Sequence, residues 1–142
     1  MTIAAILDRK GRDVVTVAMD SSVREVVTLL ADRRIGAVVV LDNSGGIAGI
    51  LSERDVIANI CREEDLLDCT AARIMSSPAV TVPSEGQVLP ALALMSRRKI
   101  RHLPVVDGDE LVGIVSIGDL VQYRIENITA EAEAMREYIQ AV

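Results

Sequence analysis

The sequence predicts a mixed α/β (α+β) fold made of two copies of a strand–helix–strand–strand–helix unit and a C-terminal helix. An internal repeat, the spacing of apolar residues and the placement of turn residues support this prediction. Residues 15–42 align with 80–107 without a gap, and 47–57 align with 111–121 after a slightly shorter loop. The identities include Val15-Thr16-Val17 with Val80-Thr81-Val82, Gly49-Ile50 with Gly113-Ile114, Ser52 with Ser116, and Asp55 with Asp119.

Each copy begins with a short β-branched strand followed by an amphipathic helix. Ser22 and Glu25 have the spacing of a capping box at the start of the first helix. Pro90 is tolerated only in the first turn of a helix, so the second helix should begin near Gln87. The strands are 14–17 and 80–82, and the apolar stripes are Val23, Val26, Val27, Leu30 and Val88, Ala91, Leu92, Met95.

The next part of each copy predicts a β-hairpin followed by a helix. Ala37–Leu41 and Leu103–Val106 are continuous apolar runs, as expected for strands covered on both faces. Turn-forming residues follow each run. The closing helices should begin near Glu53 and Ile117, and a short helix near residues 71–75 should end before Pro78.

These elements divide the chain into four segments. We expect a first repeat with its N-terminal segment at 1–62, a connector with a short helix at 63–78, and a second repeat at 79–125. Residues 126–142 form a C-terminal helix extension. The last helix carries apolar residues spaced 4, 3, 4, 3, 4, which is a coiled-coil seam: Val121, Ile125, Ile128, Ala132, Met135 and Ile139. Packing onto its own domain and self-association are two open interpretations of this seam.

Composition restricts the function. The formal net charge is −6 and the only aromatic residues are two tyrosines besides one histidine, which argues against nucleic-acid binding. No apolar run is long enough for a membrane helix and the N-terminus lacks a signal-peptide pattern, so we expect a cytoplasmic protein. Cys61 and Cys69 fit neither a disulfide framework nor a metal motif. We expect no catalytic activity, because the lone His102 has no partner motif.

The repeated Ser-x-x-Asp sequence is the strongest candidate for binding. It occurs as Ser52 to Asp55 and as Ser116 to Asp119, each time between a strand and a helix. Helix capping alone would explain this pattern. The N-terminus of a helix also favours a phosphate, and a carboxylate one turn later can accept hydrogen bonds from a ribose diol. Capping and binding are compatible interpretations.

Two further features lie in the second copy. Pro104 removes a ladder hydrogen bond from its strand, which either marks an edge strand or frees a backbone group for another partner. Basic residues gather just before this strand at Arg97, Arg98, Lys99 and Arg101, and in the first copy at Arg33 and Arg34. Such clusters are typical of solvated helix ends, and they could also hold phosphates.

Taken together, the doubled unit, the segment Arg101–Asp107 (RHLPVVD) and the pair GILSERD (49–55) and GIVSIGD (113–119) resemble a tandem pair of CBS domains, the Bateman module. The resemblance is greatest to stand-alone bacterial CBS-domain proteins. It implies two repeats packed through their sheets with pseudo-twofold symmetry. It also implies two clefts for an adenosine-containing ligand (AMP, ADP, ATP, NAD or S-adenosylmethionine) and a homodimer.

The resemblance assigns roles to residues at matching positions. Asp119 and Asp55 would hold ribose hydroxyls, while Ser116 and Ser52 would meet ribose or phosphate oxygens. The remaining assignments are adenine recognition by backbone around His102, Leu103 and Pro104, cleft walls at Thr81, Thr16 and Ile117, and phosphate contacts from Arg54, Arg101 and His102. We expect the Asp119 cleft to be the better site, because the first copy has Val39 in place of Pro104.

The resulting hypothesis is a non-catalytic regulatory protein that senses an adenine nucleotide and signals to an unknown downstream protein. The alternative is a protein–protein interaction module whose ligand clefts are vestigial. Binding of nucleic acid or of a membrane is not expected.

Overall fold

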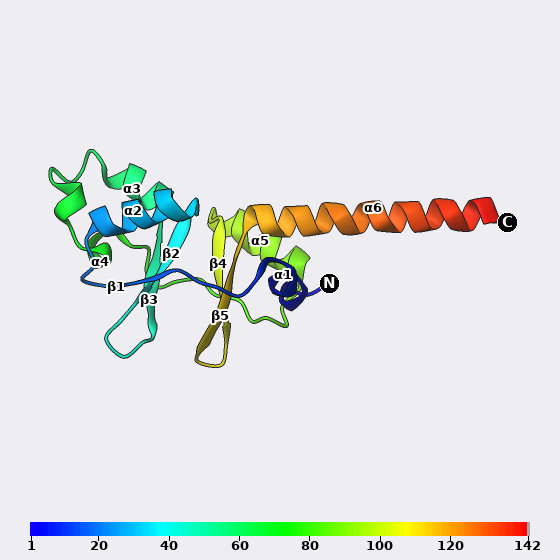
Figure 1. Ribbon diagram of the computed structural model, residues 1–142, viewed down its shortest axis with the longest axis horizontal. Helices are drawn as coiled ribbons and strands as arrows, with labels where there is room; N and C mark the ends of the chain where they lie inside the picture. Colours follow the sequence, from blue (N-terminus) through cyan, green and yellow to red (C-terminus); the bar gives the residue numbers. More distant parts are fainter. Residues whose placement is uncertain (142) are drawn as a thin grey trace.

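The chain forms two α/β units that lie side by side, and a long C-terminal helix projects from the second unit (Figure 1). The computed structural model describes residues 1–141. The first unit contains β1 (Thr16–Ala18), α2 (Val23–Arg33), β2 (Ala37–Leu41), β3 (Ile47–Ser52) and α3 (Glu53–Asn59). A connector with the 3-10 turn η1 (Leu66–Asp68) and α4 (Ala71–Ile74) leads to the second unit, which contains α5 (Val88–Arg98), β4 (His102–Asp107), β5 (Glu110–Ser116) and α6 (Ile117–Ala141). A further helix, α1 (Ile3–Lys10), precedes the first unit.

The predicted strand–helix–strand–strand–helix order is confirmed in the first unit. β1 pairs with β2 in parallel and β2 pairs with β3 in an antiparallel hairpin. The Asp42 carboxylate accepts hydrogen bonds from the backbone N–H groups of Ser44 and Gly46, which fixes the hairpin turn. The helix α2 begins after Ser22, whose hydroxyl accepts from the Glu25 N–H at 3.1 Å. The sequence therefore places these elements through local capping and turn chemistry.

The second unit repeats the hairpin, but its first strand is reduced to a single bridge. β4 pairs with β5 antiparallel, and Val82 bridges Val105 in parallel. In the first unit, the Val39 N–H donates to the Val15 carbonyl at 3.1 Å. Pro104 lies at the position of Val39 and has no N–H, so this bond cannot form with the Val80 carbonyl. The proline thus shortens the strand predicted at 80–82.

Helix α1 precedes the first repeat in the sequence but packs into the core of the second. Ile3 and Leu7 are fully buried among side chains of α5, β4 and β5. Leu7 lies so close to Gly113 that a Cβ on this glycine would be 2.7 Å from the Leu7 Cδ2. The sequence analysis did not predict this helix, although Thr2 caps it and Ile3, Ile6 and Leu7 have helical spacing. The N-terminal segment therefore belongs structurally to the second core.

The two units contact each other through their strands and the adjoining turns. Val38 and Val40 of β2 belong to the first core, whereas Val39 is fully buried on the opposite face of this strand. A Cβ on Gly36 would lie 2.9 Å from the His102 Nε2, so the two repeats approach closely there. The Arg54 guanidinium also donates to the Lys99 carbonyl at 3.0 Å. Figure 1 shows the β2–β3 hairpin of the first unit beside the β4–β5 hairpin of the second.

Helix α6 is continuous and leaves the body after its first turns (Figure 1). Leu120 is buried in the second core, while every residue from Ile128 to Ala141 is exposed. The distal helix therefore does not pack onto its own domain, and self-association through the seam stays a prediction. None of the helices within residues 1–141 is long and apolar enough to cross a membrane.

The docking of α1 gives a stability prediction. Leu7→Ala should lower the free energy of unfolding by about 2–5 kcal/mol, because it removes a fully buried side chain and leaves a cavity against β5. Urea unfolding followed by circular dichroism measures this loss. Asp8→Ala, on the exposed side of the same helix, should change the value by less than about 0.5 kcal/mol. Equal effects of the two substitutions would show that α1 does not pack as described.

Candidate nucleotide-binding site

A cavity with a volume of about 600 Å³ lies at the junction of the two repeats. Its walls come from the β3–α3 turn of the first repeat, the end of the connector, and the α5–β4 turn of the second repeat. The apolar part of the lining is Ile50, Ile57, Pro78, Ala79, Val80 and Ile100. Ser52, Glu53, Arg54, Asp55, Ser76, Lys99, Arg101 and His102 supply the polar part. The cavity therefore combines apolar walls with converging polar groups, as small-molecule sites do.

Asp55 occupies the first turn of α3 and is held by three hydrogen bonds. Its Oδ2 accepts from the Ser52 N–H at 2.8 Å and from the Ser52 hydroxyl at 3.1 Å. Its Oδ1 accepts from the Ser76 hydroxyl at 2.8 Å. The capping interpretation of Ser-x-x-Asp is thus confirmed, and the carboxylate is fixed in orientation at the wall of the cavity. A hydroxyl donor of a ligand could replace the Ser76 hydroxyl with little rearrangement, because this side chain is exposed.

The cavity carries three permanent cations. Arg54 extends from α3, and Lys99 and Arg101 come from the turn between α5 and β4. Lys99 is one of two non-glycine residues with a left-handed backbone conformation, with φ of 55°, and it ends α5 at the cavity mouth. These groups lie on two repeats, so an anion between them would join the repeats electrostatically.

The surroundings of His102 in the cavity shift its pKa. Burial lowers its pKa below the ordinary histidine value, and the charges of Lys10 and Arg101 act in the same direction. The carboxylates of Glu53 and Asp119 oppose this shift without cancelling it. The lowered pKa favours the neutral imidazole at pH 7, and contact of His102 with a phosphate stays a prediction.

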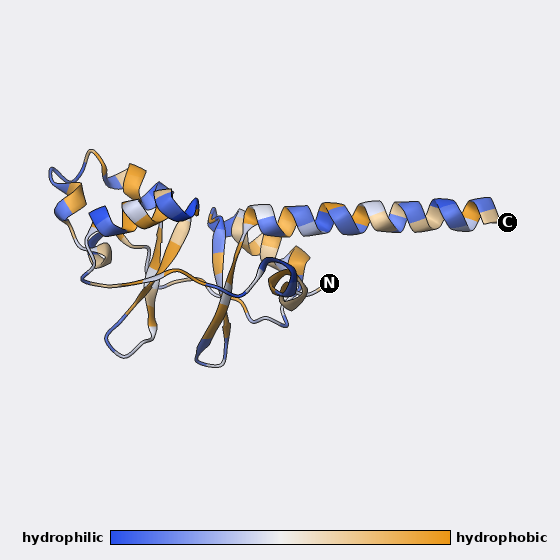
Figure 2. Ribbon diagram, viewed as in Figure 1, coloured by the Kyte–Doolittle hydropathy of each residue, from blue (hydrophilic) through white to orange (hydrophobic). Residues whose placement is uncertain are grey.

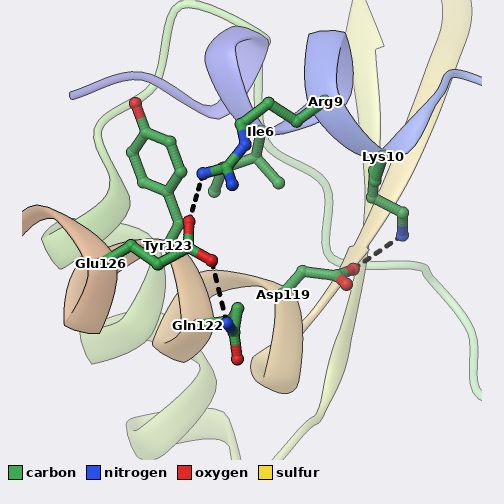
Figure 3. A pocket seen from close by; sticks show the side chains of 7 residues that line it. All are labelled: Ile6, Arg9, Lys10, Asp119, Gln122, Tyr123 and Glu126. Atoms are coloured by element: carbon green, nitrogen blue, oxygen red, sulfur yellow. Dashed lines mark hydrogen bonds and ion pairs between the residues drawn. The ribbon is translucent and has the colours of Figure 1, made fainter.

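Asp119 lies in a separate, smaller groove of about 240 Å³ between α1 and α6 (Figure 3). The Lys10 ammonium donates to the Asp119 Oδ2 at 2.6 Å and to the Ile114 carbonyl at 2.9 Å. Ser116 completes a capping box, since its N–H donates to the same carboxylate at 2.8 Å. Partial burial acts to raise the Asp119 pKa, but the hydrogen bonds and the charge of Lys10 outweigh it, so the pKa is lowered.

An ion pair between Arg9 and Glu126 also holds the wall of this groove, and Gln122 donates to Glu126 at 2.9 Å (Figure 3). The side chain of Tyr123 lies against Arg9, with the guanidinium carbon 5.8 Å from the ring centroid. One wall of the groove beside Asp119 is therefore formed by side chains of α1. In this arrangement Lys10 occupies the carboxylate that the sequence analysis assigned to a ribose.

The structure separates the predicted site residues into three sets. Ser52, Arg54, Asp55, Arg101 and His102 line the large cavity together. Ser116 and Asp119 form the capping box beside the smaller groove, and Ile117 begins the same helix. The other predicted residues lie outside both: Leu103 and Pro104 are buried, and Thr16 and Thr81 are exposed elsewhere.

Adenine recognition by the backbone around Leu103 and Pro104 stays a prediction. The Leu103 side chain itself is fully buried in the second core, which leaves only its backbone for this contact. The Pro104 carbonyl accepts a hydrogen bond from the Val82 N–H at 3.1 Å, so it is not the backbone group that the proline leaves without a hydrogen-bond partner. The group that lacks its ladder donor is instead the carbonyl of Val80, and Val80 lines the large cavity.

Several lining residues escaped the sequence analysis. Ser76 and Pro78 come from the connector, and Ala79 and Val80 lie at the start of the second repeat, where no local motif indicates binding. They reach the site because Ser76 pairs with Ile50, donating to its carbonyl at 2.8 Å and accepting from its N–H at 3.0 Å. Lys10 was missed for the same reason, since only the docking of α1 brings it to Asp119.

Comparison with known proteins agrees with this architecture. The CBS domain family matches residues 6–62 and 71–126. The chain therefore belongs to the CBS-domain family and carries two tandem copies of the domain. It is 32% identical over 129 residues to the protein MK0525 of Methanopyrus kandleri, covering 89% of this chain and 66% of that one. The chain thus spans about two thirds of the length of this relative.

Solved structures of the family show the same fold. The CBS-domain-containing protein ATU1752 of Agrobacterium tumefaciens is 36% identical with a TM-score of 0.83, and the match covers 87% of this chain and 92% of that chain. The CBS domain protein PAE2072 of Pyrobaculum aerophilum, whose structure is a complex with AMP, is 34% identical with a TM-score of 0.75. That match covers 84% of this chain and 89% of the other.

The lowered pKa of His102 predicts a pH dependence of stability. Below about pH 6.5 the unfolded chain binds a proton at this residue while the folded chain resists it, so the free energy of unfolding falls as pH falls. His102→Gln should lack this contribution. Urea unfolding at intervals from pH 7.5 to 5.5 should therefore show a steeper loss in the wild type than in the variant. Parallel profiles would refute the burial of a neutral His102.

Proposed function

We propose that the chain is a regulatory CBS-pair protein that binds an adenine nucleotide in the cavity between its two repeats. One observation carries the proposal: the cavity brings a fixed carboxylate, an apolar wall and three cations together. A volume of about 600 Å³ lies in the range of small-molecule pockets. The AMP complex of the Pyrobaculum aerophilum protein supports this ligand class.

Each part of a nucleotide has a complementary wall. Asp55 would accept the ribose hydroxyls, and the adenine ring would lie among aliphatic side chains such as Ile50 and Ile100. The cations Arg54, Lys99 and Arg101 would neutralise phosphate oxygens. Because the cavity is cationic, this arrangement favours the phosphate-bearing candidates AMP, ADP, ATP and NAD over S-adenosylmethionine, whose sulfonium is itself positive.

The carbonyl of Val80 is the proposed acceptor for the adenine amino group. It lacks the ladder donor that its counterpart Val15 has, and an unpaired carbonyl at a cavity wall gains from a ligand donor. In this proposal Pro104 does not contact the adenine ring directly. The proline would act by keeping the Val80 carbonyl free.

Binding would be converted into a signal through the geometry of the two repeats. The ligand contacts both α3 of the first repeat and the α5–β4 turn of the second, so it favours the angle at which both can reach it. A ligand shifts a conformational equilibrium only by its differential affinity for the two states. A downstream protein that reads this angle, in the cytoplasm, completes the proposed pathway.

The two aspartates of the repeated motif provide a matched test. Asp55→Asn should weaken AMP binding by about tenfold or more, because it removes a charged acceptor from the ribose hydroxyls. Asp119→Asn should change the affinity by less than about threefold, since Lys10 already occupies that carboxylate. Isothermal titration calorimetry on both variants measures the difference.

The reverse order of these two effects would move the site to the Asp119 groove. If none of AMP, ADP, ATP, NAD and S-adenosylmethionine changes the melting temperature of the wild-type protein, an interaction module with vestigial clefts is favoured. A bound nucleotide at 100-fold its dissociation constant stabilises a protein by about 2.7 kcal/mol, which a thermal shift resolves. Calorimetry should follow the melting, because the chain has no tryptophan.

A second test concerns the Val80 carbonyl. Pro104→Val places the residue of the first repeat at this position and supplies the missing N–H to Val80. The variant should extend the strand and weaken AMP binding by about three- to tenfold, the value of one hydrogen bond. Calorimetric affinity is the measurement, and Val39→Ala controls for a change in packing at the equivalent position. An unchanged affinity in Pro104→Val would exclude the carbonyl as the adenine acceptor.

A further inference from the structure

Helix α6 carries an apolar stripe that nothing in the described chain covers. Its members Ile125, Ile128, Met135 and Ile139 are 57%, 48%, 61% and 66% exposed. Figure 2 shows apolar patches recurring along the projecting helix between hydrophilic ones. The stability of a protein helix comes mainly from packing an amphipathic face, and a short isolated helix is marginal in water. The distal helix therefore requires a partner for this stripe.

The stripe faces away from the body of its own chain. Leu120 and Tyr123 lie on the side of α6 that packs against the second core. At 3.6 residues per turn, the stripe is centred roughly 110° around the helix from that side. Val121 continues the stripe at the base of the helix and is 40% exposed. A second helix can thus lie along the whole stripe without displacing α5.

The spacing of the stripe identifies the kind of partner. Val121, Ile128 and Met135 occupy the d positions of a heptad, and Ile125, Ala132 and Ile139 occupy the a positions. This pattern is the seam of a coiled coil, in which an equivalent helix supplies the facing residues. A second copy of α6 has the required pattern.

Charges beside the seam favour a parallel orientation. In a parallel pair, the g residue of one helix faces the e residue of the next heptad on the other. Glu131 is at g and Arg136 is at e, so Glu131 would face Arg136 of a second copy, and twofold symmetry makes this contact twice. In an antiparallel pair with aligned seams, Glu131 would face Arg124 instead, but the Arg124 guanidinium lies against the Met1 sulfur of its own chain. We propose that α6 pairs with α6 of a second copy as a parallel coiled coil extending from the body of the dimer, independently of any ligand in the cavity.

Cysteine cross-linking tests both pairing and orientation in the full chain. In a Cys61→Ser, Cys69→Ala background, Ile128→Cys should form a covalent dimer on mild oxidation, because parallel pairing puts the two copies of residue 128 in one layer. Ala130→Cys lies at an outward f position nearby and should cross-link at least about tenfold less. An equal yield from the two variants would overturn the proposal. Cross-linking of Val121→Cys chains to Ile139→Cys chains, which an antiparallel pair places in one layer, would overturn the parallel orientation.

Charge reversal tests the pairing without cysteine chemistry. Glu131→Arg should weaken dimerisation about tenfold in sedimentation equilibrium, since it sets like charges against each other twice. Glu133→Arg changes the net charge equally but lies at an outward b position and should have little effect. Adding Arg136→Glu to Glu131→Arg should restore dimerisation by exchanging the two charges. If Glu133→Arg weakens the dimer equally, or the exchange restores nothing, the seam does not pair as proposed.

Discussion

The cavity depends on the close approach of the connector to the edge of β3. Ser76 exchanges two backbone hydrogen bonds with Ile50 and donates its hydroxyl to Asp55. Gly49 permits this approach, because a Cβ at that position would lie 2.6 Å from the Ser76 carbonyl oxygen. The same contact carries residues 78–80 to the cavity wall and orients the carboxylate. A larger residue at Gly49 would therefore disturb the wall and the polar group together.

The two repeats share a backbone fold, but the surroundings of Asp55 in the first differ from those of Asp119 in the second. The first repeat has a complete three-stranded sheet, and its Asp55 opens onto the cavity. In the second repeat Pro104 interrupts the equivalent ladder, and Lys10 of α1 neutralises Asp119. These differences meet at the cavity, because the proline of the second repeat leaves the Val80 carbonyl without a ladder donor and Val80 lines the cavity beside Asp55. Two similar sequences thus form one large cavity across their junction and one smaller groove in which Lys10 pairs with Asp119.

The sequence predicts the fold well because local chemistry determines its elements. Ser22 caps α2, Asp42 fixes a hairpin turn, and Ser52 with Asp55 begins α3, as their spacing indicates. The site was predicted less completely, since its composition depends on contacts between distant segments. The repeat alignment selects Asp55 and Arg101 as candidates, but it does not show that they line one cavity, as the structure does. Nor does it reveal Lys10, which reaches Asp119 only because α1 joins the second core.

Backbone hydrogen–deuterium exchange with and without AMP is the decisive measurement for an adenine nucleotide bound between the repeats at Asp55, because it reports on each segment of the intact protein. Such binding should slow exchange in residues 52–57, 76–80 and 99–102, with little change at residues 116–120. Protection confined to residues 116–120 and α1, or no protection at saturating AMP, would contradict it.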